Sequence, residues 1–208
     1  LLTQARLERY EHLEAENRRL RALLESSAKL EDRVLIAELI NVDMDPFSRR
    51  IVLNKGLRHG VVAGQSLIDA NGIMGQVAHV DPLSSTALLI TDPSHALPVQ
   101  INRTGYRGIA VGTGQPDALE LRHVPNNVDL RVDDLVVTSG LGGRFPPGYP
   151  VGRITSIQRD SAQAFARVQI EPSANLERNR EVLLIVPPQP EAGAEGSEGA
   201  SGGTRRAL

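Results

Sequence analysis

The chain has 208 residues, 40% of them hydrophobic, which is enough for one large or two small domains with a buried core. Its 23 Lys and Arg against 25 Asp and Glu give a net charge of −2, and its aromatic residues are three Tyr, three Phe and no Trp. This charge balance and the few aromatic residues disfavour a nucleic-acid binder. Because the chain has no cysteine, disulfide, thiol and cysteine–zinc chemistry are excluded.

Residues 1–32 are predicted to form an α-helix, because the first thirty positions are rich in Leu, Glu, Arg and Ala and contain neither Gly nor Pro. A seam whose members alternate between spacings of three and four runs along this helix, as in a two-stranded coiled coil. We expect two chains to form a homodimer through it. The seam consists of Tyr10, Leu13, Asn17, Leu20 and Leu24.

Charged residues on both sides of the seam fit a parallel dimer. Arg9 would face Glu14 of the second chain and Glu16 would face Arg21, so both pairs have opposite sign. Asn17 can pair with its twin across the dimer axis but is unsatisfied in most other arrangements, and we expect it to fix the register.

An alternative for the same helix is that it lies on the chain's own β-domain, which Leu7, Leu23 and Leu30 outside the seam favour. Only two heptads are clear, and isolated helices of that length are marginal in water. Because the chain begins at Leu1 within helical sequence, we expect further helix or a membrane anchor upstream. The apolar runs of the chain itself are far shorter than the roughly 18 to 20 residues that span a bilayer.

Residues 33–186 have a different sequence pattern, in which short runs of Val, Ile and Leu are separated by turn signals such as Asn71-Gly72. Short strands at roughly ten-residue spacing predict a mainly β fold, in which the N-terminal coiled-coil helix is followed by two small β-barrel-like subdomains. We place these at roughly 33–115 and 116–186, with an exchange of strands between them left open. Residues 187–208 are rich in Pro and Gly without an apolar pattern, and we expect a disordered tail.

The β region contains an internal repeat. Stretches 73–80 and 150–157 share the pattern apolar-Gly-x-apolar-x-x-apolar, and each is followed by a second predicted strand. Gly75 and Gly152 lie inside these strand patterns, where a missing side chain is typical of a bulge or a close approach of two backbones. The repeat predicts two subdomains of similar plan.

No residue pattern indicates catalysis. Ser139 lies in a Gly-rich stretch that could hold a nucleophile, as in a two-barrel hydrolase, but no motif places His59, His79 or Asp92 as its base and acid. The five histidines are never two to four residues apart, so no metal-ligand spacing exists. We therefore expect a protein that is not an enzyme and that has no cofactor or metal.

The segment Phe145-Pro146-Pro147-Gly148-Tyr149-Pro150 places two of the six aromatic residues in a proline-stiffened loop. An exposed ring in such a loop loses little entropy on binding, which makes Phe145 and Tyr149 candidate partner-binding residues. The alternative is that both rings fold back and close a barrel end.

One stretch is specific enough to suggest a family. The run Thr138-Ser139-Gly140-Leu141-Gly142-Gly143-Arg144-Phe145-Pro146-Pro147-Gly148, followed by Val151-Gly152, resembles the MreC family of bacterial rod shape-determining proteins. Asn54-Lys55-Gly56 and the 72–80 hairpin fall where that family has them, and the match covers Leu1 to about Pro188.

The resemblance implies a bitopic inner-membrane protein whose periplasmic part is this chain. It implies a non-enzymatic scaffold of the cell-elongation machinery that maintains rod shape, associates with itself, and binds and activates a class B penicillin-binding transpeptidase, with MreD and MreB as further partners. It also implies two six-stranded barrels. The alternative from a related class is a periplasmic adaptor of an efflux or secretion system, although such adaptors need a helical hairpin between β halves.

Overall fold

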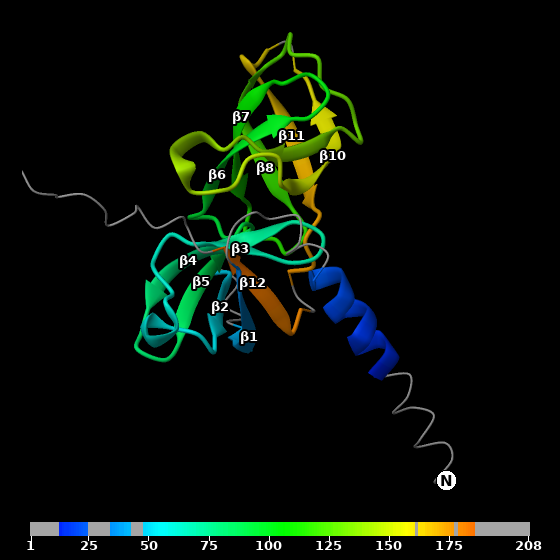
Figure 1. Ribbon diagram of the computed structural model, residues 1–208. Coiled ribbons are helices and arrows are strands. Elements are labelled where there is room, and N and C mark those ends of the chain that lie inside the picture. The colour runs from blue at the N-terminus through cyan, green and yellow to red at the C-terminus, as the bar shows by residue number, and fades with distance from the viewer. Residues whose placement is uncertain (1–12, 25–33, 43–47, 161, 177–178, 186–208) are drawn as a thin grey trace, which may run out of the picture.

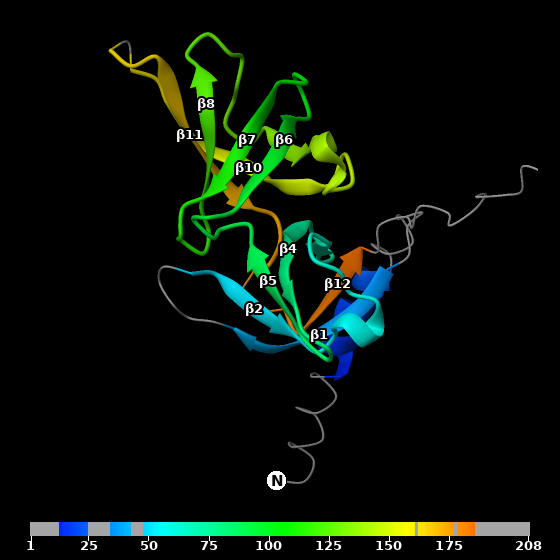
Figure 2. The ribbon, with the colours of Figure 1, turned by 90° about the vertical axis from the view of Figure 1, so that its left-hand side faces the viewer.

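The computed structural model describes residues 13–24, 34–42, 48–160, 162–176 and 179–185, and consists of a short helix and two closed β-barrels (Figure 1). The second barrel is stacked on the first, and the helix lies beside the first barrel (Figures 1 and 2). The expectation of two six-stranded barrels is confirmed. The coiled coil is not shown, because the described helix is short and belongs to a single chain.

All neighbouring strands in the first barrel are antiparallel, in the closed order β1-β12-β3-β4-β5-β2. Its strands are β1 (Val34–Val42), β2 (Arg50–Leu53), β3 (Ser66–Ile68), β4 (Ile73–Val80), β5 (Ser85–Leu89) and β12 (Glu181–Ile185), with a 3-10 turn at Leu57–His59.

The second barrel is also antiparallel throughout, in the closed order β10-β11-β8-β7-β6-β9. Its strands are β6 (Ala96–Ile101), β7 (Arg107–Gly112), β8 (Leu119–Pro125), β9 (Leu135–Thr138), β10 (Pro150–Gln158) and β11 (Phe165–Pro172), with a 3-10 turn at Leu141–Gly143.

The two barrels have the same plan once β1–β5 is laid on β7–β11. The strand that completes each barrel comes from the other repeat, since β6 follows β1–β5 but closes the second barrel, and β12 follows β7–β11 but closes the first. The division expected at residues 115 and 116 does not follow the barrels. Strands β6 and β7 precede it but belong to the second barrel, because each sheet is closed by long-range pairing that the order of runs in the sequence does not reveal.

The repeat extends to individual backbone positions. A Cβ atom on Gly75 would lie 2.0 Å from the Leu88 carbonyl oxygen, and one on Gly152 would lie 2.2 Å from that of Glu171, so both glycines allow a close approach of two strands. Each of these strands also shifts register against its following partner. Gly64 and Asp133 both have positive φ, at 89° and 70°, and each lies two residues before the start of its strand, β3 and β9 respectively.

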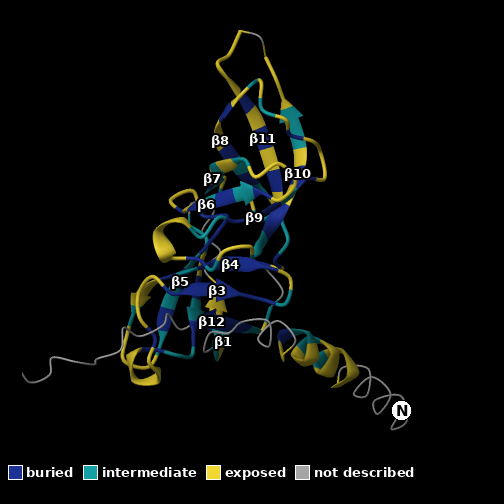
Figure 3. Cartoon of the chain, turned by 45° about the horizontal axis from the view of Figure 1, so that its top comes forward, coloured by how far each residue is buried: buried dark blue, intermediate teal, exposed yellow. Residues whose placement is uncertain are grey.

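Apolar side chains fill the interior of each barrel, and buried and exposed residues alternate along strands such as β11 (Figure 3). Strand β12 differs, because four consecutive residues, 182–185, are buried. The helix contacts the start of this strand. Leu23 belongs to the hydrophobic core, and Arg19 forms an ion pair with Glu181 of β12 at 2.6 Å.

Two buried carboxylates fix the segments at which the chain passes between the barrels. Asp69 accepts hydrogen bonds from the backbone N–H groups of Asn71 and Gly72 in the first barrel, and from Asn175 and Asn179 on the returning segment. Asp92, on the outgoing segment, accepts hydrogen bonds from the backbone of Arg49 and from Ser94. Within the described residues, no helix combines the length and the apolar character that a membrane crossing needs.

Candidate interaction sites

The helix at residues 13–24 presents two faces with different roles. Leu23 and Arg19 contact the first barrel, whereas the leucines of the predicted seam are between 39% and 60% exposed and Asn17 is exposed beside them. At 100° per residue, the seam lies about a third of the helix circumference away from the packed face. Packing on the chain's own barrel, the alternative considered for this helix, therefore leaves the seam free. The exposed leucines are Leu13, Leu20 and Leu24.

The residues expected to flank the seam are present on the described helix only in part. Glu14 and Arg21 are exposed and Glu16 is half-buried. The other two interface residues, Arg9 and Tyr10, lie outside the described residues, as do residues 25–33 and the predicted tail at 187–208. The inter-chain pairs of the dimer stay predictions.

The aromatic loop of the second barrel folds inward. Phe145 is 4% exposed and packs edge-on against the ring of His95, with centroids 6.0 Å apart, and Tyr149 is half-buried against the core. Of the two alternatives for this loop, the inward one describes the structure, because burial of the Phe145 ring removes a large apolar surface from water. Phe145 does not present its ring for binding on the surface of the chain.

Hydrogen bonds from one residue hold the ends of this loop together. The Thr138 hydroxyl donates to the carbonyl oxygen of Pro146 and accepts from the backbone N–H of Tyr149, and the Thr138 carbonyl accepts from Gly148. Gly140, Gly142, Gly143 and Gly148 all have positive φ, between 65° and 78°. The glycines around Ser139 are therefore explained by the left-handed backbone conformation that this loop requires.

A cleft of about 740 Å³ lies where the inward-folded loop meets the first barrel. Its walls are formed by residues 62–66 and 76–78 of the first barrel, by residues 140 and 143–147 of the second, and by Ile185 at the end of β12. The Ser66 hydroxyl donates to the Arg144 carbonyl at 2.5 Å across it. Val62 and Pro147 are exposed on its rim, so the cleft presents apolar side chains to an incoming partner.

His95 lies behind this loop on the segment that leads into the second barrel. Burial lowers the pKa of His95 to about 4, opposed by the nearby Asp92 carboxylate, and neither ring nitrogen has a hydrogen-bond partner. Burial raises the pKa of Asp92, but hydrogen bonds from Ser94 and Arg49 outweigh it, so the pKa falls below its usual value. His95 is therefore neutral at pH 7 and packs as an apolar ring.

A charged cluster near the start of β9 was not anticipated from the sequence. Arg103 donates to both carboxylate oxygens of Asp134, at 2.7 and 2.9 Å, and to Asp129 at 2.7 Å. Hydrogen bonds from Arg103 lower the pKa of Asp134 and of Asp129, and the pKa of Arg103 is raised in turn. This cluster ties the β6–β7 turn to the segment before β9, a structural role.

The geometry around Ser139 does not resemble a catalytic triad. The Ser139 hydroxyl accepts a hydrogen bond from the Leu141 backbone at 3.4 Å, and the buried His95 ring makes no hydrogen bond that could activate it. Among the described residues, no group of three or more His, Asp or Glu side chains is arranged to hold a metal ion. The helix seam and the cleft both present exposed apolar side chains, which are suited to binding other proteins.

Known proteins share this arrangement. Residues 39–186 match the family described as "Rod shape-determining protein MreC, barrel core". The chain is 45% identical to the cell shape-determining protein MreC of Escherichia coli over 170 residues, which cover 82% of this chain and 46% of that protein. The chain thus spans about half the length of the relatives it matches.

Solved structures agree with the sequence comparison. The crystal structure of MreC from Pseudomonas aeruginosa is 51% identical, with a TM-score of 0.72 over 74% of this chain and 99% of that one. A complex between the penicillin-binding protein PBP2 and MreC from Helicobacter pylori contains the same fold, with a TM-score of 0.58 at 16% identity over 74% of this chain and 99% of that one. Together with the two exchanged barrels, these matches show that the chain belongs to the MreC family of rod shape-determining proteins.

Proposed function

We propose that this chain is a non-enzymatic scaffold of the bacterial cell-elongation machinery, which maintains rod shape by self-association and by binding a peptidoglycan transpeptidase. The observation that carries the proposal is the free seam of the helix. Leu13, Leu20 and Leu24 stay exposed although Leu23, on the same helix, is packed against the barrel. Exposed leucines at coiled-coil spacing are removed from water when a second helix packs along them.

The proposed dimer would hold two pairs of barrels at a fixed distance from one another. The Arg19–Glu181 ion pair and the buried Leu23 limit rotation of the helix on its own barrel. Pairing of two helices therefore orients both copies of the barrels, which is what a scaffold needs in order to present a docking surface.

The docking surface for a class B penicillin-binding transpeptidase is proposed at the rim of the cleft between the barrels. The complex of PBP2 with the MreC of Helicobacter pylori supports this class of partner. Val62 and Pro147 offer apolar contacts there, while Phe145 and Tyr149 shape the loop from its inner side. In this proposal the contact holds the transpeptidase in its active conformation, and Phe145 acts by positioning the loop.

Membership of the family supports the remaining parts of the proposal. The whole protein would be a single-pass inner-membrane protein with this chain in the periplasm, and MreD and MreB would be further partners. The efflux or secretion adaptor considered as an alternative is not favoured, because residues 48–160 form strands joined by short connections and contain no helical hairpin.

Sedimentation velocity of the protein with its complete N-terminal stalk tests the dimer. Leu20→Asp places a charge in the seam, and we expect single chains where the parent protein forms dimers. Asn17→Leu removes the amide that the proposed dimer would bury, and we expect a higher melting temperature together with species larger than dimers. Leu83→Asp, at an exposed position of the first barrel, is the control and should leave the dimer unchanged. A parent protein that sediments only as single chains would contradict self-association.

Co-purification with a class B transpeptidase tests the cleft. We expect Val62→Asp to abolish capture, and Phe145→Ala and Tyr149→Ala to weaken it because the loop loses its inner support. Val132→Asp, an exposed apolar position away from the cleft, should behave as the parent chain. Transpeptidase turnover with and without the chain then measures activation. Equal capture by the parent and the Val62→Asp variant would move the docking surface elsewhere.

A further inference from the structure

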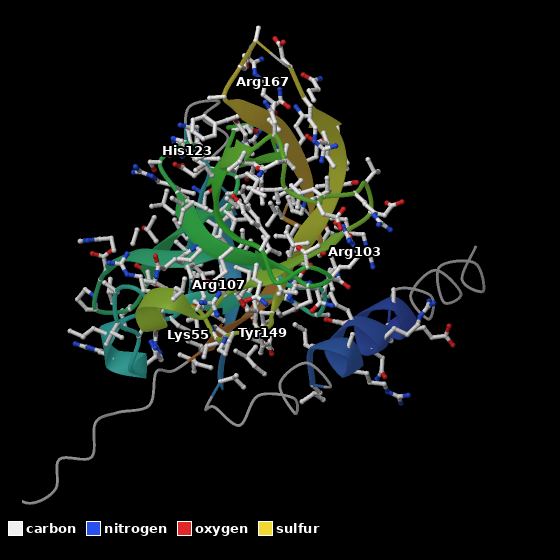
Figure 4. All side chains as sticks on the ribbon, turned by 90° about the horizontal axis from the view of Figure 1, so that it is seen from above. Lys55, Arg103, Arg107, His123, Tyr149 and Arg167 are labelled. Carbon is white, nitrogen blue, oxygen red and sulfur yellow. The ribbon has the colours of Figure 1, made fainter. Side chains whose placement is uncertain are left out.

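The outer end of the second barrel carries a group of exposed residues that neither the seam nor the cleft includes. We define the β8–β11 patch as Ile109, Arg122, His123, Phe165 and Arg167, all of which are exposed. Figure 4 looks down on this end of the molecule, where His123 and Arg167 are labelled. Phe165, one of the three phenylalanines of the chain, is 47% exposed, whereas Phe145 is buried.

A β-bulge brings the polar members of the patch to the surface together. Leu121 pairs with Val168 and Val124 pairs with Ala166, so the two residues between Leu121 and Val124 on β8 oppose Arg167 alone on β11. Those two residues are Arg122 and His123, and His123 has a φ of 56°. Bulges with such backbone angles reorient side chains and are frequent beside functional sites.

The charges of the patch are not paired within the described residues, although the half-buried Glu120 lines one hollow together with Arg167. Among the described residues, neither Arg122 nor Arg167 forms an ion pair, although they lie on neighbouring strands, where like charges destabilise a sheet. Arg103 of the same barrel, by contrast, has two carboxylate partners. A bound carboxylate between Arg122 and Arg167 would turn this repulsion into two charge-assisted hydrogen-bonded pairs.

Apolar surface lies directly beside these charges. The Phe165 ring packs edge-on against the His123 ring with centroids 5.5 Å apart, which holds the ring in place at the surface. Ile109 pairs with Arg122 across β7 and β8 and is also exposed. Exposed aromatic and Arg side chains held in fixed positions are typical of the residues that dominate protein–protein binding.

We propose that the β8–β11 patch binds an acidic segment of a partner protein, with carboxylates on Arg122 and Arg167, one apolar side chain against Phe165 and another against Ile109. A protein segment is favoured over a polyanionic polymer because two cations flanked by exposed apolar side chains match a ligand that has both carboxylates and hydrocarbon. The patch is separate from the helix seam and from the cleft, so the proposal does not depend on the transpeptidase contact.

Fluorescence anisotropy of a labelled peptide rich in Glu with interspersed Leu tests the proposal on the full 208-residue chain. We expect the peptide to bind, with an affinity that falls as NaCl is raised, and its Gln-for-Glu counterpart to bind far more weakly. The double change Arg122→Gln, Arg167→Gln should weaken binding by roughly tenfold or more. Phe165→Ser should weaken it by about threefold or more while the salt dependence is unchanged.

A matched control comes from the first barrel, where Leu57 and Arg58 are likewise exposed. The double change Leu57→Ser, Arg58→Gln should leave binding unchanged, and circular dichroism establishes that every variant is folded. The proposal is overturned if the parent chain does not bind the acidic peptide, or if the control loses as much affinity as the patch variants. It is also overturned if polygalacturonate binds as tightly as the peptide and Phe165→Ser has no effect, because the patch would then be a site for polyanions in general.

Discussion

At the scale of single residues, buried polar groups between the barrels determine much of the behaviour of the molecule. The Asp69 carboxylate joins the β3–β4 turn to the segment that returns from the second barrel, and His95 supports the loop that forms one wall of the cleft. The Asp69 carboxylate accepts several hydrogen bonds, whereas neither ring nitrogen of His95 has a hydrogen-bond partner. Substitution of Asp69 should therefore lower stability, whereas substitution of His95 should change how stability depends on pH.

Asp69→Ala is expected to lower the free energy of unfolding by about 3 kcal/mol, because it leaves backbone and Asn179 donors without acceptors in a buried place. Urea unfolding followed by circular dichroism measures the loss. Asp81→Ala, which removes an exposed carboxylate that pairs with the exposed His79 ring, should change stability little. A loss of the same size in both variants would contradict the role given to Asp69.

His95→Phe is expected to make stability less dependent on pH. The pKa of His95 is lowered to about 4 in the folded chain, so its neutral form contributes fully above pH 6.5, and this contribution is lost as the pH falls toward 4. The corresponding change is about 3 kcal/mol. Urea unfolding at pH 7.5 and pH 4.5 should show a smaller difference for His95→Phe than for the parent chain.

Histidine at an exposed position provides the comparison. His79→Phe replaces a ring on the surface of the first barrel, and it controls for the loss of an exposed imidazole. An identical slope of stability against pH in His95→Phe and in the parent would show that His95 does not titrate with unfolding.

At the scale of elements, the helix shows how one segment serves two contacts. Leu23→Ala is expected to weaken its attachment to the first barrel by about 2 kcal/mol, because a buried leucine is truncated. Hydrogen exchange measured on dilute, monomeric chain should become faster in residues 13–24 and stay unchanged in both barrels. Leu13→Ala alters only the exposed face and should leave the exchange rates as they are.

At the scale of the whole molecule, the exchange of β6 and β12 makes the barrels unequal in autonomy. The strands of the second barrel are contiguous in sequence, from Ala96 to Pro172. The first barrel, by contrast, needs β12 as its sixth strand, and β12 follows the whole second barrel in the sequence. We expect a fragment of residues 93–174 to fold alone and a fragment of residues 34–92 to remain unfolded, because it would expose the edges of β1 and β3.

Adding a peptide of residues 179–185 should restore structure to the 34–92 fragment, since this peptide supplies β12. Circular dichroism and dispersed amide signals in nuclear magnetic resonance measure both outcomes. A 34–92 fragment that folds without the peptide would show that β12 is not needed to close the first barrel.

The sequence by itself determined the local features of this protein. Spacing placed Leu13, Asn17, Leu20 and Leu24 on one face of a helix, and the repeated glycine pattern at Gly75 and Gly152 indicated two β units of the same plan. These features depend on residues close together in the chain, where periodicity and turn chemistry act directly. The family could be recognised for the same reason, because its motif is a continuous stretch.

Only the tertiary structure decided which strand closes which barrel, where Phe145 points and what forms the cleft. Each of these depends on contacts between segments far apart in the sequence, such as Ser66 with Arg144 and His95 with Phe145. Hydrophobic burial is not directional, so an apolar strand or ring can satisfy it in several places. The choice among those places is made by the packing of the complete chain.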